Sequence, residues 1–234
     1  MKQLIQDLKT GSTHLLDIPA PKASKGHLII QTTYSLLSPG TERMLVNFSK
    51  ANLFNKATQQ PEKVKETLQK VKSDGVFATI DAVKTKLDQP LALGYSNVGN
   101  VIDIGEGVKG FKIGDRVVSN GPHAELVSVP FNLCSHIPVE VNDETAVFTI
   151  LASIGLQGIR LANPTLGETF LVSGLGLIGL LTAQLLSSQN CLVLGIDPDP
   201  EKCSLAESLG IPSFNCTNGK EPLLWINEHT KGLG

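Results

Sequence analysis

The sequence has no strong excess of either charge and no long apolar run. Its 20 Lys and Arg residues nearly balance 22 Asp and Glu, so the formal net charge is -2. This balance gives no electrostatic reason to expect nucleic acid or an anionic membrane as a partner. Every apolar run is also shorter than the roughly 20 residues that a membrane-spanning helix needs. We therefore expect neither nucleic acid nor a membrane among the partners.

Paired cysteines and a secretory leader are also missing. The four cysteines are far apart, and none forms a C-x-x-C pair of the kind that binds zinc or cycles as a dithiol. The first residues, "MKQLIQDLKTGS", lack the continuous apolar core and the small-residue cleavage site of a signal peptide. The sequence thus predicts free thiols and a cytoplasmic protein.

What is present is an ordinary globular composition with two different periodicities. Hydrophobic residues make up 41% and charged residues 18% of the 234 residues, enough for two domains with real cores. Up to about residue 130, short β-like runs alternate with the turn-forming stretches "SPG", "GEG" and "IGD". That spacing predicts a mostly antiparallel β-domain over residues 1–143.

A helical insertion is predicted within this β-domain, at about residues 45–88. Val64, Leu68 and Val71 recur at helical spacing, and a second amphipathic run follows Gly75. Two roles stay open for the insertion. It either covers a hydrophobic face of the β-domain, or it acts as a lid or a partner-binding element.

From about Glu144 the pattern changes to alternating helices and strands. An apolar helix "ETAVFTILASIGLQGIRLA" precedes the strand "ETFLVSG", the helix "LIGLLTAQLLSS", the strand "CLVLGID" and the helix "PEKCSLAESLG". This order predicts a parallel sheet of βαβ units over residues 144–234, so the fold class is α/β.

Three glycines in that second region form G-x-G-x-x-G between a strand and a helix. A carboxylate, Asp197, ends the next strand, where dinucleotide-binding folds hold the adenosine ribose. We predict a dinucleotide site; the alternative is a glycine-rich turn without a ligand. The predicted cofactor-binding residues are Gly174, Gly176, Leu177, Ile178, Gly179, Asp197, Pro198 and Thr149.

The charge around Asp197 favours NAD over NADP. A carboxylate repels a ribose 2'-phosphate, and the following Pro198 supplies no cation. Lys202 lies close enough in sequence to keep NADP open as the less favoured cofactor.

Taken together, these segments resemble the medium-chain dehydrogenase/reductase superfamily, of the zinc alcohol dehydrogenase type. The resemblance lies in "SPGTE" at 38–42, "PLALGYSNVGNVIDIGEGVKGFKIGDRV" at 90–117, "HAELVSVP" at 123–130, and the glycine loop. It implies a GroES-like catalytic domain followed by a Rossmann domain. The chain supplies three of the six Rossmann strands, so we expect an incomplete sheet whose first strand has an unpaired edge.

The metal ligands of zinc-dependent members are replaced in this sequence. By resemblance, the segment C-G-T-D/E has become "PGTE" and G-H-E has become "GYS", which puts Pro39, Tyr95 and Ser96 at the ligand positions. These residues make a poor Zn2+ site, and the four cysteines of the family's structural zinc lobe are also missing. We expect no metal, and a member of the zinc-less branch.

Without zinc, a reacting carbonyl needs another proton source. The resemblance places Tyr95 in the cleft, where it would exchange a proton with the substrate, and places His123 nearby as a shuttle. Thr41 and Glu42 would orient the substrate or support the cleft. The alternatives are that Tyr95 only packs at the domain interface and that His123 is an ordinary turn residue.

The resulting hypothesis is an NAD(P)-dependent, zinc-independent oxidoreductase that interconverts an alcohol and a carbonyl on a polar substrate. Its partners would be that small molecule and, as an open expectation, a second copy in a homodimer. Two zinc-less types are similar. One is bacteriochlorophyllide dehydrogenase. The other, preferred, is the N-terminal module of bacterial bi-domain oxidoreductases, which implies a sugar-linked substrate and a truncated chain.

Two other functions stay open. The chain could be a nucleotide-binding module without turnover, or a quinone or enone reductase.

Overall fold

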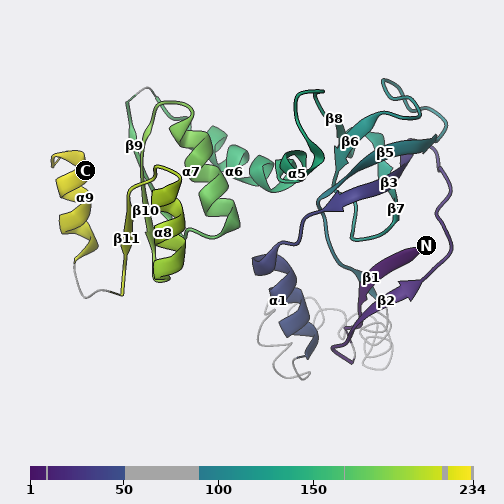
Figure 1. Cartoon of the computed structure of the whole chain (residues 1–234), viewed down its shortest axis with the longest axis horizontal. Helices are drawn as coiled ribbons and strands as arrows, with labels where there is room; N and C mark the ends of the chain where they lie inside the picture. Colours follow the sequence, from purple (N-terminus) through teal and green to yellow (C-terminus); the bar gives the residue numbers. More distant parts are fainter. Residues whose placement is uncertain (9, 51–89, 166, 218–220, 233–234) are drawn as a thin grey trace, which may run out of the picture. The chain divides into compact units, whose positions relative to one another are not determined.

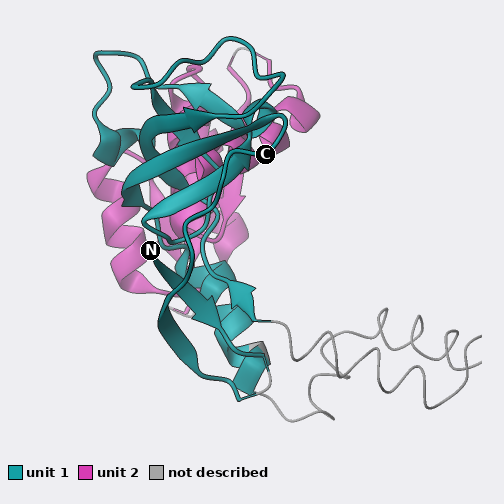
Figure 2. Cartoon of the chain, turned by 90° about the vertical axis from the view of Figure 1, so that its right-hand side faces the viewer, with its two compact units in different colours: residues 1–147 teal, residues 148–234 magenta. Residues whose placement is uncertain are grey.

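The computed structural model describes residues 1–8, 10–50, 90–165, 167–217 and 221–232. The chain forms two compact units, Met1–Val147 and Phe148–Gly234 (Figure 2). The predicted boundary between residues 143 and 144 falls in the short helix α5 (Asp143–Ala146), just before this division. Most of the predicted insertion at about 45–88 lies outside the described residues.

The first unit is built on antiparallel sheets, as predicted. Its larger sheet has five strands in the order β7-β3-β5-β6-β8, and a smaller one has the order β2-β1-β4 (Figure 1). The strands are β1 (Lys2–Gln6), β2 (Thr13–Asp17), β3 (His27–Ser35), β4 (Leu91–Ala92), β5 (Asn97–Ile104), β6 (Arg116–Ser119), β7 (Leu126–Pro130) and β8 (Cys134–His136); a short 3-10 turn, Phe131–Leu133, precedes β8.

Alternating side chains of these strands form the core of the first unit. Leu28 and Ile30 of β3 pack with Val101 of β5, Val117 of β6 and Val127 of β7, all almost fully buried. Because successive residues of a strand face opposite sides, these five side chains pack on one face of the sheet, while Ile29 and Val118 are buried on the other. The core fixes β3 and β5, the two strands beside the candidate site.

Helix α1 (Pro39–Lys50) corrects one prediction. "SPG" was interpreted as a turn, but the helix begins at Pro39, six residues before the predicted insertion. Proline suits a first helical turn because its missing N–H would have no intrahelical acceptor there. The Glu42 carboxylate accepts a hydrogen bond from the Ser38 N–H at 2.8 Å, which satisfies a donor at the helix start.

The second unit contains a parallel sheet in the order β11-β10-β9 with helices around it, which confirms the α/β class (Figure 1). Its elements are α6 (Thr149–Ala162), β9 (Thr169–Ser173), α7 (Leu177–Ser187), β10 (Leu192–Asp197), α8 (Pro200–Ser208), β11 (Ser213–Asn215) and α9 (Pro222–Thr230).

One predicted helix is divided in two. The run "ETAVFTILASIGLQGIRLA" forms α5 and α6 rather than one helix, with the break at Val147 and Phe148. At the break, the buried Ser96 hydroxyl donates to the Val147 carbonyl oxygen at 2.5 Å. The helix is thus interrupted where a residue 51 positions earlier in the sequence hydrogen-bonds to it. The helical periodicity of the sequence does not indicate this contact.

The two edges of the parallel sheet differ. In the described part of the chain, β9 pairs only with β10, and Leu171 of β9 is 45% exposed, as expected for an unpaired first strand. At the other edge, Trp225 of α9 packs on Phe214 of β11 with ring centroids 5.5 Å apart, so this tryptophan holds the last helix on the sheet.

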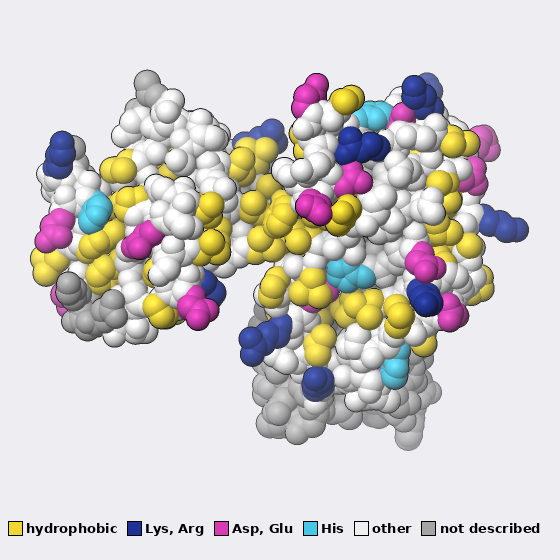
Figure 3. Space-filling view, in the orientation of Figure 1, with side chains coloured by type: hydrophobic (Ala, Val, Ile, Leu, Met, Phe, Trp, Pro, Cys, Tyr) yellow, Lys and Arg dark blue, Asp and Glu magenta, His cyan; other side chains and the backbone are white. Residues whose placement is uncertain are grey.

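Exposed apolar side chains occur on both units, for example Val139 on the first and Leu161 on the second; yellow patches are visible in Figure 3. None of the described helices is both long and apolar enough to cross a bilayer.

Candidate active site and cofactor loop

Tyr95 and Thr41 lie together in the first unit. The Tyr95 hydroxyl donates to Thr41 Oγ1 at 3.3 Å, and both side chains are half-buried. Thr41 is in the first turn of α1, whereas Tyr95 lies just before β5. The phenol is therefore held by a hydroxyl partner while part of its surface stays open.

Glu42 and His123 form a second pair. His123 Nε2 lies 3.0 Å from Glu42 Oε2, and Glu42 is 4% exposed. His123 Nδ1 lies 2.8 Å from Ser35 Oγ at the end of β3. Because an ionised carboxylate only accepts hydrogen bonds, Nε2 is the nitrogen that donates to Glu42. The other ring nitrogen, Nδ1, is left to interact with the Ser35 hydroxyl.

Gly94 explains how His123 reaches this position. A β-carbon on Gly94 would lie 2.6 Å from the His123 ring and 2.7 Å from its backbone nitrogen, and the Gly94 φ angle is +89°. The His123 N–H also donates to the Leu93 carbonyl at 2.8 Å. The imidazole thus packs on bare backbone next to Tyr95. The glycine serves both the turn and the close approach.

The structure brings Thr41, Glu42, Tyr95 and His123 into two hydrogen-bonded pairs within one unit, and Thr41 and Glu42 are neighbours in sequence. No hydrogen bond in the described part of the chain joins one pair to the other. Sequence reasoning missed Ser35, because its contact with His123 spans 88 residues and belongs to no motif.

Two of the residues that the resemblance aligns with metal ligands have structural roles in the first unit. Ser96 is fully buried and its hydroxyl is committed to Val147, while Pro39 begins α1. Among the described residues, no group of three or more His, Cys, Asp or Glu side chains could hold a metal ion.

The glycine loop of the second unit connects β9 to α7. Gly174 has a φ angle of +95°, which favours glycine. A β-carbon on Gly174 or Gly176 would meet no atom within 4 Å, so open space adjoins the backbone at both. By contrast, a β-carbon on Gly179 would collide with the Gly174 carbonyl oxygen. The three glycines thus allow the turn, leave room for a ligand and let helix and strand pack closely.

Leu177 and Ile178 form the first turn of α7, and their N–H groups point out of the helix start without intrahelical acceptors. These donors and the positive end of the helix dipole suit a phosphate group. The residues present therefore fit a dinucleotide pyrophosphate.

Asp197 ends β10 and is 4% exposed. Its two carboxylate oxygens accept hydrogen bonds from the backbone N–H groups of Leu175 and Asp199, each at 2.8 Å. Burial on its own raises the pKa of Asp197, but the N–H groups of Asp199 and Leu175, together with Lys202, outweigh it and lower the pKa below the usual value. The carboxylate is therefore ionised and ties β10 to the glycine loop.

Lys202 lies between two carboxylates. Its Nζ is 3.6 Å from both Asp197 Oδ1 and Asp199 Oδ2. Asp199 also caps α8 by accepting the Glu201 N–H at 3.0 Å. Sequence reasoning did not include Asp199, although an aspartate directly before Pro200 is a typical helix start.

The two remaining predicted cofactor residues are exposed. The Pro198 carbonyl accepts a hydrogen bond from Asn215 Nδ2 at 3.2 Å. Thr149 starts α6, and no hydrogen bond among the described residues joins it to the glycine loop.

Comparisons with known proteins agree with this architecture. Residues 66–157 match the family model of the alcohol dehydrogenase GroES-like domain. The chain is 28% identical over 178 residues to a sorbitol dehydrogenase of Halalkalibacterium halodurans, covering 62% of this chain and 52% of that protein. It is 32% identical over 122 residues to a D-guloside 3-dehydrogenase of Escherichia coli, covering 50% of this chain and 35% of that protein.

A quinone oxidoreductase structure from Pseudomonas syringae superposes with a TM-score of 0.72 at 17% identity, over 99% of this chain and 63% of that one, which shows the shared fold. These similarities support the medium-chain dehydrogenase/reductase superfamily, and the two relatives given above are named dehydrogenases. The chain spans about half the length of the sorbitol dehydrogenase that it matches.

We predict that Gly94→Ala destabilises the first unit more than Gly107→Ala does. Both glycines have positive φ angles, but only Gly94 has an imidazole and a backbone nitrogen where the new methyl would go. The additional cost is about 1–3 kcal/mol, as for other overpacked sites. Urea denaturation followed by circular dichroism measures the difference, and equal losses of stability in the two variants would contradict the packing described.

We also predict that the stability difference between the wild-type chain and Asp197→Asn depends on pH. Because the folded-state pKa of Asp197 lies below its unfolded value, the carboxylate stabilises the fold above pH of about 4. This contribution is lost as the pH falls through the folded-state pKa. Unfolding free energies at several pH values test it, with the exposed Asp17→Asn as control. A difference that does not change with pH would refute the role of Asp197.

Proposed function

We propose that the protein is an NAD(P)-dependent, zinc-independent oxidoreductase that interconverts an alcohol and a carbonyl on a polar substrate. The observation that carries the proposal is the pairing of Tyr95 with Thr41 and of Glu42 with His123, four residues from three separate segments. Since the chain spans about half of the sorbitol dehydrogenase, the proposal concerns the activity of the whole protein.

A bound nicotinamide cofactor would supply the hydride chemistry. Within the chain, the backbone of Gly174 and Gly176 and the first turn of α7 would hold the pyrophosphate, and Asp197 would accept hydrogen bonds from the ribose. Leu177, Ile178, Gly179, Pro198 and Thr149 complete the proposed cofactor site.

Tyr95 would exchange the proton. Its hydroxyl is held by Thr41, and a phenol can donate a proton to a developing alkoxide, or take one from an alcohol in the reverse direction. The buried Glu42 carboxylate and His123 hold the start of α1, where Thr41 lies. Thr41 and Glu42 are adjacent in sequence, so His123 and Glu42 would position Thr41, and through it the phenol.

Zinc independence is supported by the chemistry of the substituted residues. Proline offers no side-chain ligand, and the Ser96 hydroxyl is buried and donates to a carbonyl. Tyrosine and serine are also outside the set of Cys, His and carboxylate groups that zinc prefers.

NAD is the preferred cofactor in this proposal. Asp197 and Asp199 place two carboxylates at the end of β10, and Lys202 lies between them rather than free to pair with a 2'-phosphate. Negative charge at this position repels the additional phosphate of NADP.

A sugar-linked or polyol-like substrate is favoured by the names of the sorbitol and D-guloside dehydrogenases among the relatives. The proposal also includes a catalytic domain at 1–143, a cofactor domain at 144–234, a bi-domain parent protein, a cytoplasmic location and a homodimer.

We predict that the chain binds NADH more tightly than NADPH and that Gly176→Ala weakens NADH binding about tenfold or more. The Gly176 φ angle is -73°, so alanine is tolerated there, but its methyl group would occupy the open space left for the pyrophosphate. Gly158→Ala is the matched control, because a β-carbon there also meets nothing and lies outside the loop.

Calorimetric titration of the wild-type chain and both variants gives the affinities. The proposal would be wrong about the cofactor loop if Gly176→Ala bound NADH as tightly as Gly158→Ala did. Tighter binding of NADPH would instead reverse the predicted cofactor preference and favour the quinone or enone reductase.

A further inference from the structure

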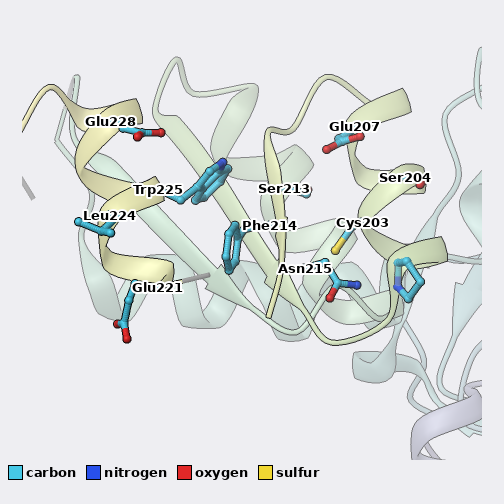
Figure 4. Close-up of a pocket in the computed structure, with 11 residues that line it drawn as sticks. Cys203, Ser204, Glu207, Ser213, Phe214, Asn215, Glu221, Leu224, Trp225 and Glu228 are labelled. Carbon is cyan, nitrogen blue, oxygen red and sulfur yellow. The ribbon is translucent and has the colours of Figure 1, made fainter. Parts of the chain in front are cut away.

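A pocket of about 710 Å³ lies between α8, β11 and α9 of the second unit (Figure 4). Its volume is within the range of small-molecule sites. Neither the glycine loop nor Asp197 is among the residues that line it. Asn215, which lines the pocket, donates to the Pro198 carbonyl, so the pocket adjoins the proposed cofactor site without including its glycine loop. A ligand bound in the pocket would not require the proposed oxidoreductase activity.

Two aromatic rings form the middle of the pocket. Phe214 of β11 is 6% exposed, and Trp225 of α9 packs beside it and is half-buried (Figure 4). Trp225 lines the pocket and so presents part of its indole to it. The faces of aromatic rings attract cations, and indole does so most strongly.

Three carboxylates surround these rings. Glu207 comes from α8, while Glu221 and Glu228 come from the start and the middle of α9. The eleven lining residues include no Lys, Arg or His, and none of the three glutamates forms a salt bridge within the described residues. The His229 ring packs on Trp225, with the two ring centroids 4.2 Å apart, and it is not a lining residue. Because the lining itself carries three acidic side chains and no basic one, the pocket favours a cation.

The arrangement of the carboxylates limits the kind of cation. Figure 4 shows Glu207 and Glu228 on opposite sides of the pocket, with the aromatic pair between the elements that carry them. No cluster of His, Cys, Asp or Glu in the described part of the chain could hold a metal ion, so these carboxylates do not converge on one point. The site therefore suits several positive charges separated by apolar spacers.

We propose that this pocket binds an aliphatic polyamine. Its ammonium groups would pair with Glu207 and Glu228, and the methylene chain between them would lie against Trp225. The carboxylates supply the charge complementarity, and the indole supplies both an apolar surface and an attraction for cations.

The single tryptophan of the chain gives a direct test, since Trp225 is itself a wall of the pocket. Titration with spermidine at constant ionic strength is expected to change the tryptophan fluorescence saturably. The double variant Glu207→Gln/Glu228→Gln should bind spermidine about tenfold more weakly or worse, because each exposed ion pair contributes up to about fivefold in affinity. Glu140→Gln, an exposed glutamate of the first unit, should bind like the wild-type chain.

The controls separate charge from nonspecific effects. A neutral diol of similar length and MgCl2 should leave the fluorescence unchanged, and circular dichroism checks that the variants are folded. The proposal is overturned by the absence of a saturable change, by the same change with the diol or with Mg2+, or by unaltered affinity in the double variant.

Discussion

The buried Glu42 carboxylate is the constraint on which the candidate active site depends. A carboxylate that is almost withdrawn from water needs partners, and Glu42 has two, the Ser38 N–H at the start of α1 and the His123 ring from a distant loop. Satisfying this one group fixes the beginning of α1 and therefore Thr41, to which Tyr95 donates its hydrogen bond.

The second unit also contains a buried carboxylate whose hydrogen bonds hold the backbone in place. Asp197 is also a buried carboxylate, and the backbone N–H groups of Leu175 and Asp199 satisfy it. In the first unit the buried acid holds a helix start beside side chains suited to proton exchange. In the second it holds a glycine loop suited to phosphate. In each unit, the hydrogen bonds that offset the cost of burying the carboxylate also hold a backbone segment in place.

Local patterns explain why much of the fold could be predicted. The alternating runs at 27–35 and 97–104, the G-x-G-x-x-G loop and the acid at the end of β10 depend on neighbours in sequence, and their periodicity is visible there. The start of α1 at Pro39 was missed although its hydrogen bond from the Ser38 N–H to Glu42 is local, because "SPG" is also typical of a turn. The break between α5 and α6 was missed because the hydrogen bond at it comes from Ser96, 51 residues before Val147. The approach of His123 to Ser35 and Gly94 was missed for the same reason: only the folded sheet brings these segments together.

The most direct test of the central claim is hydride transfer itself. The whole protein, treated with a metal chelator, would be incubated with NADH carrying deuterium at the transferable position of C4 and with a panel of polyol-derived ketones. The account predicts deuterium on the carbinol carbon of the product despite the chelator, and a large loss of transfer, on the order of a hundredfold, in Tyr95→Phe without a loss of NADH binding. A folded whole protein that binds NADH but transfers no deuterium to any ketone would contradict the account and favour a nucleotide-binding module without turnover.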